Sequence, residues 1–168
     1  MTIAVGSDSA QHIGEVVMRH LAERGIAVSA CGALAGRSAD YIDSALEVGE
    51  KVARGECQFG VLLCNTGTGA SIIANKVPGV RAALCLDAYA ARIARLANSA
   101  NVLVLSMRLT GDMLAAEILD EWLATSPSTE PRRVAFHRKT EEVEARYRKA
   151  PASARRRRAR AAAQGDPS

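Results

Sequence analysis

Short apolar runs alternate along this chain with longer segments in which apolar residues recur at helical spacing. Residues 2–6 form the first apolar run, which predicts a strand. The segment after it carries apolar residues every three or four positions and predicts a helix that ends at Gly25. The apolar face of this helix consists of Ile13, Val16, Val17 and Leu21. The strand and the helix together predict one β-α unit.

The same alternation continues to about residue 125 and predicts five β-α units. The further strands are expected at 26–30, Phe59–Cys64, 80–85 and 101–105. The second helix follows the stripe Ile42, Ala45, Leu46, Gly49 and Val52, a short helix precedes Pro78, and another helix covers 87–97. The last helix of the series is expected to bury Met113, Leu114, Ile118, Leu119 and Trp122, with Thr110 or Asp112 as its cap. Residues 132–149 predict a charged C-terminal helix that packs separately.

The third strand, Phe59–Cys64, is apolar almost throughout, which is typical of a parallel strand covered on both faces. Strands that alternate with helices over short connections predict an open parallel sheet with helices on both sides. Ligands of such sheets bind outside the carboxyl ends of the strands. We therefore expect an α/β fold whose functional residues directly follow the strands.

Length and charge change this picture only at the C-terminus. The 168 residues, of which 48% are hydrophobic, suit one globular domain. The net charge of +4 comes from residues 151–168, because residues 1–150 hold 17 basic and 17 acidic side chains. We interpret residues 1–150 as the domain and 151–168 as a disordered arginine-rich tail, with a weak arm for anions or nucleic acid as the alternative. The neutral domain does not indicate a nucleic-acid partner.

Four cysteines, at positions 31, 57, 64 and 85, form no CxxC pair, and no two histidines have zinc-ligand spacing. The sequence therefore predicts neither a disulfide framework nor a metal site. No basic segment precedes the first apolar run, and no run approaches the roughly 20 apolar residues that a membrane span needs. We expect a cytoplasmic protein with reduced thiols.

A glycine-rich segment follows the third strand and reads Cys64-Asn65-Thr66-Gly67-Thr68-Gly69-Ala70-Ser71. Glycines let the backbone approach a ligand closely, and the start of the following helix offers free N–H groups to an anion. A dinucleotide fingerprint would need a glycine in place of Ile72, and a Walker loop would need Gly-Lys-Ser/Thr, which is absent. The segment predicts an anion site bordered by a thiol.

Cys64 is the candidate reactive group of this segment. A cysteine at a strand end is usually a small core residue, and Cys31, Cys57 and Cys85 are interpreted in that way. The helix end beside Cys64 would stabilise a thiolate and lower the thiol pKa from about 8.5. Cys64 could therefore act as a base.

At these residues the sequence resembles the family of ribose-5-phosphate isomerase B and the galactose-6-phosphate isomerase subunits. Blocks typical of that family occur in order over residues 2–125: Gly6-Ser7-Asp8-Ser9-Ala10, Asp40-Tyr41, Cys64 to Gly69, Ala74-Asn75-Lys76, Gly79-Val80-Arg81-Ala82-Ala83, Asp87 with Tyr89, and Asn98 through Asn101-Val102-Leu103. The resemblance implies a Rossmann-like three-layer α/β/α sandwich and isomerisation of a tetrose, pentose or hexose phosphate through a cis-enediolate. It also implies that no metal or cofactor takes part, and that a homodimer or dimer of dimers shares its active sites between subunits.

The resemblance also assigns roles to individual residues. Cys64, Thr66 and Asp8 are the implied catalytic residues, with Cys64 as the base that moves a proton between two carbons. The implied substrate-binding residues are Ser9, Tyr41, Asn65, Gly67, Thr68, Gly69, Ser71, Asn75 and Asn98. Backbone N–H groups of residues 65–69 would hold the negative oxygen of the enediolate. Asn98 is expected to reach in from the partner subunit, and Asp8 could also cap the first helix.

Arginines are the implied phosphate ligands. Arg108 matches the arginine that follows the fifth strand in the family, and Arg132, Arg133 and Arg138 are further candidates in a C-terminal segment whose register is open. His137 is interpreted as an ordinary surface histidine, with phosphate binding as the alternative. His12 and His20 are expected to be solvated.

Two departures from the family pattern affect the choice of function. Ser9 and Ala97 stand where ribose-phosphate members carry histidines, so the residue that opens a furanose ring is missing. A catalytically silent sugar-phosphate-binding protein and a flavodoxin-like mononucleotide binder are therefore kept as alternatives. The retained Cys64 favours the enzyme, because binding alone needs no base. A four-carbon sugar phosphate needs no ring opening, which favours it over ribose 5-phosphate as the substrate.

Overall fold

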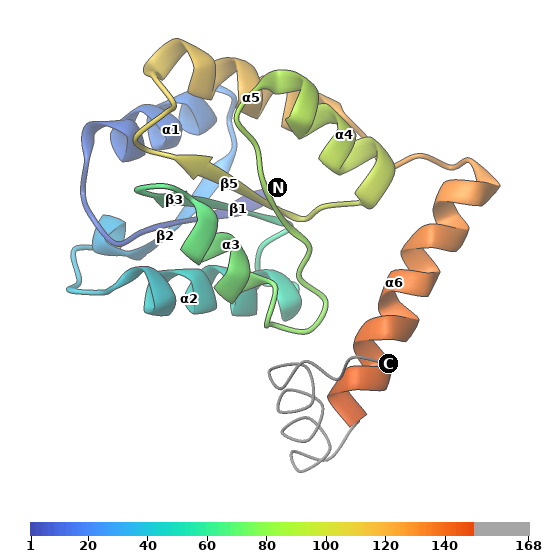
Figure 1. Ribbon diagram of the computed structural model, residues 1–168. Coiled ribbons are helices and arrows are strands. Elements are labelled where there is room, and N and C mark those ends of the chain that lie inside the picture. Colours follow the sequence, from blue (N-terminus) through green and yellow to red (C-terminus); the bar gives the residue numbers. More distant parts are fainter. Residues whose placement is uncertain (150–168) are drawn as a thin grey trace, which may run out of the picture.

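The computed structural model describes residues 1–149 as a three-layer α/β/α sandwich with an additional C-terminal helix (Figure 1). All four strand pairings are parallel, and the strand order is β2-β1-β3-β5-β4. The strands are β1 (Thr2–Ser7), β2 (Ala27–Gly32), β3 (Phe59–Cys64), β4 (Ala82–Leu84) and β5 (Val102–Ser106). The helices are α1 (His12–Glu23), α2 (Tyr41–Ala53), α3 (Thr68–Ala74), α4 (Ala88–Asn98), α5 (Asp112–Ala124) and α6 (Pro131–Lys149), with a 3-10 turn at Ala33–Ala35. The predicted α/β class is confirmed, whereas the predicted tail at 151–168 lies outside the described residues.

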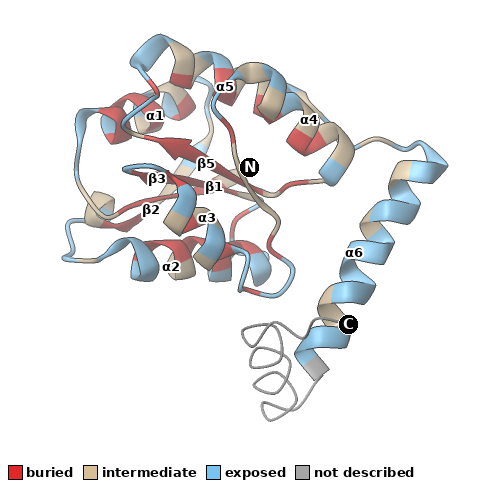
Figure 2. Ribbon diagram, in the orientation of Figure 1, coloured by how far each residue is buried: buried red, intermediate tan, exposed pale blue. Residues whose placement is uncertain are grey.

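Two apolar clusters cover the two faces of the sheet. One joins the sheet to α1, α4 and α5, and the other joins it to α2 and α3. Figure 2 shows the buried residues gathered on the sheet and on the helix faces that cover it. The central strand β3 contributes Val61 and Leu63 to the first cluster and Leu62 and Cys64 to the second. This explains why its sequence is apolar without alternation.

The start of α5 differs from the prediction. Gly111 is the N-terminal boundary residue, and no side chain caps the helix, so neither Thr110 nor Asp112 has the expected role. Met113 was also wrongly assigned to the core, since it is 80% exposed. Its position lies about 200° around the helix from Ala115, which is buried, so Met113 faces solvent.

The fourth strand is shorter than the predicted segment 80–85. The Val80 N–H bonds to the Val77 carbonyl in a turn, and the Arg81 N–H is taken by the Asn101 side chain, so sheet pairing begins at Ala82. β4 forms an edge of the sheet, and Asn75 occupies part of that edge. The Asn75 amide accepts a bond from Ala82 N at 2.9 Å and donates one to Ala82 O at 2.8 Å. An edge strand with free N–H and C=O groups invites pairing with other chains, and this side chain limits that.

Helix α6 leaves the sandwich and contacts it through His137 and Glu144 (Figure 1). The His137 ring contacts Ser99 Oγ at 2.9 Å and Ala97 O at 2.8 Å, and the Glu144 carboxylate accepts the Gly79 N–H at 2.9 Å. His137 is thus an anchor of the helix. Within residues 1–149, no helix combines the length and apolarity that crossing a bilayer requires.

Candidate active site

The carboxyl ends of β1, β3 and β5 lie side by side at one edge of the sheet (Figure 1). Ser7 of β1 pairs with Leu63 of β3, and Cys64 pairs with Ser106 of β5. This register brings the segments 7–9, 64–69 and 106–108 together, although they are distant in sequence. The predicted residues Asp8, Cys64 and Arg108 therefore lie at the same edge.

Glycine is required at the turn after Cys64. Gly67 has a φ of +78°, and a Cβ built there would lie 2.5 Å from Leu84 Cδ1. The loop after β5 holds the same turn, because Ser106 Oγ and Arg108 N both donate to the Asn65 carbonyl, at 2.9 and 3.1 Å. These bonds tie the turn to the loop after β5, and Asn65 and Thr66 are exposed.

Tyr41 and Thr68 border the glycine-rich turn. A Cβ built on Gly69 would lie 2.8 Å from Tyr41 Cε2, so the ring packs directly on the first turn of α3. The hydroxyls of Thr66 and Thr68 share a hydrogen bond of 2.8 Å, and Ser71 follows on the same helix. These contacts place the predicted Tyr41, Thr66, Thr68 and Gly69 around one surface.

Cys64 differs from the other thiols in its surroundings. It is 7% exposed, against 0% for Cys31 and 1% for Cys85. Burial raises the pKa of Cys31 to about 11 and that of Cys85 to about 12, so both keep their protons at neutral pH. Burial also raises the pKa of Cys57. Cys64 alone of the four ends a strand directly beside the glycine-rich turn.

Asp8 has no hydrogen bond or ion pair with any residue of the described chain 1–149, and it is partly exposed. It does not cap α1, whose boundary residue is Gln11. The alternative role of Asp8 as a helix cap is therefore wrong, and its carboxylate is available to a ligand.

Met107 is a site residue that the sequence reasoning missed. Its N–H donates to the Cys64 carbonyl at 2.9 Å, and its sulfur accepts from Ser7 Oγ at 3.8 Å and Ser9 Oγ at 3.9 Å. The Ser7 hydroxyl in turn accepts the Ser9 N–H at 3.2 Å. Its place directly before Arg108 was a usable signal, because residues that follow a parallel strand line this edge.

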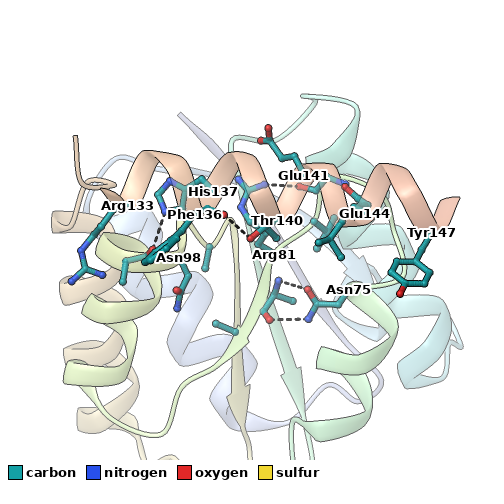
Figure 3. A pocket seen from close by; sticks show the side chains of 17 residues that line it. Asn75, Arg81, Asn98, Arg133, Phe136, His137, Thr140, Glu141, Glu144 and Tyr147 are labelled. Carbon is teal, nitrogen blue, oxygen red and sulfur yellow. Dashed lines mark hydrogen bonds between the residues drawn. The ribbon is translucent and has the colours of Figure 1, made fainter. Parts of the chain in front are cut away.

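Other predicted residues lie elsewhere. Helix α4 begins after the carboxyl end of β4 and runs antiparallel to the strands. Asn98, its last residue, therefore lies at the amino ends of the strands, opposite the end that carries Cys64. Asn75 and Arg133 also line the groove of ≈ 780 Å³ between α6 and the segment before β4 (Figure 3). Arg132 and Arg138 are exposed on α6. The chain thus carries two separate groups of predicted site residues.

The three histidines have distinct environments, and His137, which anchors α6, is partly buried and not the ordinary surface histidine that the sequence predicted. His12 is solvated as expected, with its side chain 68% exposed. The expectation for His20 is wrong, because its side chain is 12% exposed and its Nε2 lies 2.9 Å from Asp120 Oδ1. The neighbouring helix α5 covers His20, which the pattern of α1 alone could not indicate.

No group of three or more His, Cys, Asp or Glu residues in the described part of the chain could hold a metal ion. The chemistry available at the edge is a thiol, a free carboxylate, hydroxyls, backbone N–H groups and the Arg108 guanidinium. These groups suit proton transfer next to an anionic oxygen.

Comparison with known proteins decides the family. Residues 3–144 match the Ribose/Galactose Isomerase family. The chain belongs to this family. It is 41% identical over 125 residues to ribose-5-phosphate isomerase B of Escherichia coli, and the matched region covers 72% of this chain and 82% of that protein. It is 39% identical over 125 residues to D-erythrulose-4-phosphate isomerase of Pectobacterium atrosepticum, with 73% and 82% covered.

A solved relative confirms the fold. Ribose-5-phosphate isomerase B of Clostridium thermocellum superposes with a TM-score of 0.82 at 40% identity, over 88% of this chain and 99% of that one. The resemblance and the general isomerase function predicted from the sequence are therefore confirmed.

Proposed function

We propose that the chain interconverts the aldose and ketose forms of a small phosphorylated sugar, with Cys64 as the base and without a metal or organic cofactor. The observation that carries the proposal is the position of Cys64, which ends the central strand between the free Asp8 carboxylate and the glycine-rich turn. The relatives act on ribose 5-phosphate and erythrulose 4-phosphate by name, which supports a substrate of four or five carbons.

The proposed reaction moves one proton between neighbouring carbons. The Cys64 thiolate takes the proton from the carbon beside the carbonyl, and the electron pair forms the enediolate. Backbone N–H groups of residues 65–69 stabilise the negative oxygen. The Cys64 thiol then returns the proton to the other carbon, while a proton passes between the two oxygens. Asp8 holds a substrate hydroxyl and orients the chain of the sugar.

The phosphate would lie near Arg108, which is at the same edge as Cys64. Four other predicted residues lie at or beyond the amino ends of the strands, so one chain cannot bring them to its own Cys64: Asn98, Arg132, Arg133 and Arg138. We therefore assign them to the site of a second copy, in a homodimer or dimer of dimers. Such sharing also gives a function to the groove beneath α6, whose lining includes Asn98 and Phe136 (Figure 3). Cytoplasmic localisation stays a prediction.

Solvent deuterium incorporation tests the proposed chemistry. The purified protein is incubated in D₂O with tetrose, pentose and hexose phosphates, and the C1 and C2 positions are examined by NMR. Exchange at these carbons with at least one sugar is expected, because the enediolate exchanges its proton with solvent. Binding of a sugar phosphate without exchange would instead support the silent binding protein that the missing histidines suggest.

The same materials test the preferred chain length. Ser9 and Ala97 cannot perform the proton transfer that opens a furanose. We expect kcat/KM for erythrulose 4-phosphate to exceed that for ribose 5-phosphate by at least ~10-fold, which corresponds to about 1.4 kcal/mol. Equal values for the two sugars would contradict this preference.

A further inference from the structure

The Met107 side chain bridges two strands that are not neighbours. Met107 follows β5, while Ser7 and Ser9, which donate to its sulfur at 3.8 and 3.9 Å, belong to β1 and the loop after it. Strand β3 lies between β1 and β5 in the sheet. The thioether therefore spans the carboxyl end of β3 on the sheet face that α1, α4 and α5 cover.

Met107 forms a wall of the candidate site. It packs against the apolar cluster of α1, α4 and α5, yet it is only partly buried, so the rest of its surface faces the edge of the sheet. Its backbone is bonded to Cys64, and the next residue is the candidate phosphate ligand Arg108. The side chain thus lies between the end of β5 and the loop after β1, on the sheet face that α1, α4 and α5 cover, whereas Cys64 belongs to the cluster on the other face.

The chemistry of this wall is unsuited to ring opening. A thioether has no proton to donate and accepts hydrogen bonds weakly. The Ser9 hydroxyl directs its proton to the Met107 sulfur, and the Ser7 hydroxyl does the same. Neither serine then offers a proton to a ring oxygen while these bonds are made.

We propose that Met107 sets the length of sugar phosphate that the site accepts, by closing the space between the ends of β1 and β5 beside Ser9 and Arg108. This inference rests on the proposed isomerase function and names the residue that restricts it. We expect a sugar of four carbons to lie between Cys64 and Arg108 without contacting Met107, and the additional CHOH group of a longer sugar to meet the thioether. Met107 is a specificity residue, since it shapes the site and takes no part in proton transfer.

The test compares Met107→Ala with Met107→Leu, which keeps most of the volume, and with Met113→Ala as the matched control. Met113 is 80% exposed on α5, so the control makes the same chemical change outside the site. The readout is the ratio of kcat/KM for ribose 5-phosphate to that for erythrulose 4-phosphate. Removing the side chain should raise this ratio about tenfold or more, because pockets discriminate one missing or additional carbon unit by roughly 10–200-fold.

Met107→Leu and Met113→Ala are expected to keep the ratio within twofold of the starting protein. An unchanged ratio in folded Met107→Ala overturns the inference. If that variant fails to fold, Met107→Val removes part of the side chain, and the inhibition constants of four-carbon and five-carbon aldonate phosphates are compared instead. Loss of the preference for the shorter inhibitor supports the inference, and an unchanged preference overturns it.

The two proposals fail in different ways. If the starting protein exchanges deuterium with no sugar phosphate, the proposed function is wrong. If it is active but its chain-length ratio does not respond to Met107→Ala, the function stands and the assignment of Met107 is wrong.

Discussion

The residue that carries the most chemistry is Cys64, and its role is tested by Cys64→Ser. A serine hydroxyl is far too weak a base at neutral pH, so kcat should fall by about 10²–10⁴-fold, the range typical of general-base contributions. The expected KM change is small, because the hydroxyl occupies the same place. Steady-state kinetics and size-exclusion chromatography of the variant measure both effects.

Cys31→Ser is the matched control for this experiment. Cys31 is the penultimate residue of β2, lies in the same apolar cluster as Cys64 and is fully buried. Its replacement should leave kcat within a few-fold of the starting value. An active Cys64→Ser protein would remove Cys64 from the mechanism. An inactive but folded Cys31→Ser protein would show that the loss of activity is not specific to Cys64.

Thiol reactivity is a second residue-scale prediction. A thiol with a pKa near 11, as in Cys31, is ionised only to about 0.1% at pH 8, and the thiolate is the reactive form. Iodoacetamide at pH 8 should therefore modify Cys64 in the folded protein well before Cys31 and Cys85. Peptide mass spectrometry measures the order, with urea-unfolded protein as the control in which all four thiols react. Earlier modification of Cys85 than of Cys64 would contradict the structure.

At the scale of elements, Asn75 at the edge strand β4 and Asn65 in the glycine-rich turn are expected to have different roles, one in stability and one in catalysis. The Asn75 amide makes three hydrogen bonds, to Ser71 O and to both backbone groups of Ala82. Asn75→Ala leaves the β4 edge unpaired and should lower the free energy of unfolding by about 1–3 kcal/mol. Because the Asn75 amide is bonded to backbone groups of its own chain, catalysis should change little. Urea denaturation and kinetics together measure this.

Asn65→Ala is the matched comparison. The Asn65 side chain is exposed in the turn beside Cys64, and only its backbone carbonyl holds the loop after β5. Loss of the Asn65 side chain should reduce kcat/KM while changing the free energy of unfolding by less than about 0.5 kcal/mol. If Asn75→Ala instead lowers kcat/KM and leaves stability unchanged, Asn75 binds substrate, as the sequence predicted.

At the scale of the whole molecule, Cys64 lies at the carboxyl ends of the strands and Asn98 at the amino ends. This separation predicts an active site that two chains share. Cys64→Ser and Asn98→Ala proteins should each be inactive or nearly so. In a mixed dimer, the intact Cys64 of one chain meets the intact Asn98 of the other, which restores one of two sites. Random mixing in a two-fold symmetric dimer should therefore recover about one quarter of the starting activity.

The complementation needs a control for exchange between subunits. The two variants carry different affinity tags, and the activity is also measured on the doubly purified fraction, in which every dimer is mixed and about one half of the starting activity is expected. Each variant mixed with itself should stay inactive. Heterodimers that are isolated in this way and show no activity would contradict the shared site.

The sequence by itself determined the order and type of the elements. Alternation of apolar runs with helical stripes reports burial at each position, and burial on both faces of β3 is visible in its uninterrupted apolar residues. The glycine-rich turn was also readable, because the positive φ of Gly67 requires a residue without a side chain. Local conformation and binary pattern are properties of short segments, so they need no knowledge of the rest of the chain.

Only the tertiary structure decided which distant side chains meet. Met107 became a site residue because β3 lies between β1 and β5, and Asn75 became part of a sheet edge because β4 ends the sheet. Arg95 is 7% exposed, although charged residues usually face solvent. Its guanidinium packs against the rings of Phe59 and Trp122 and donates a hydrogen bond of 2.6 Å to Ala100 O. The Met107 and Arg95 cases depend on contacts between segments far apart in sequence, and the Asn75 case depends on the place of β4 in the strand order. Such contacts follow from strand order and helix packing, which the pattern along one segment does not contain.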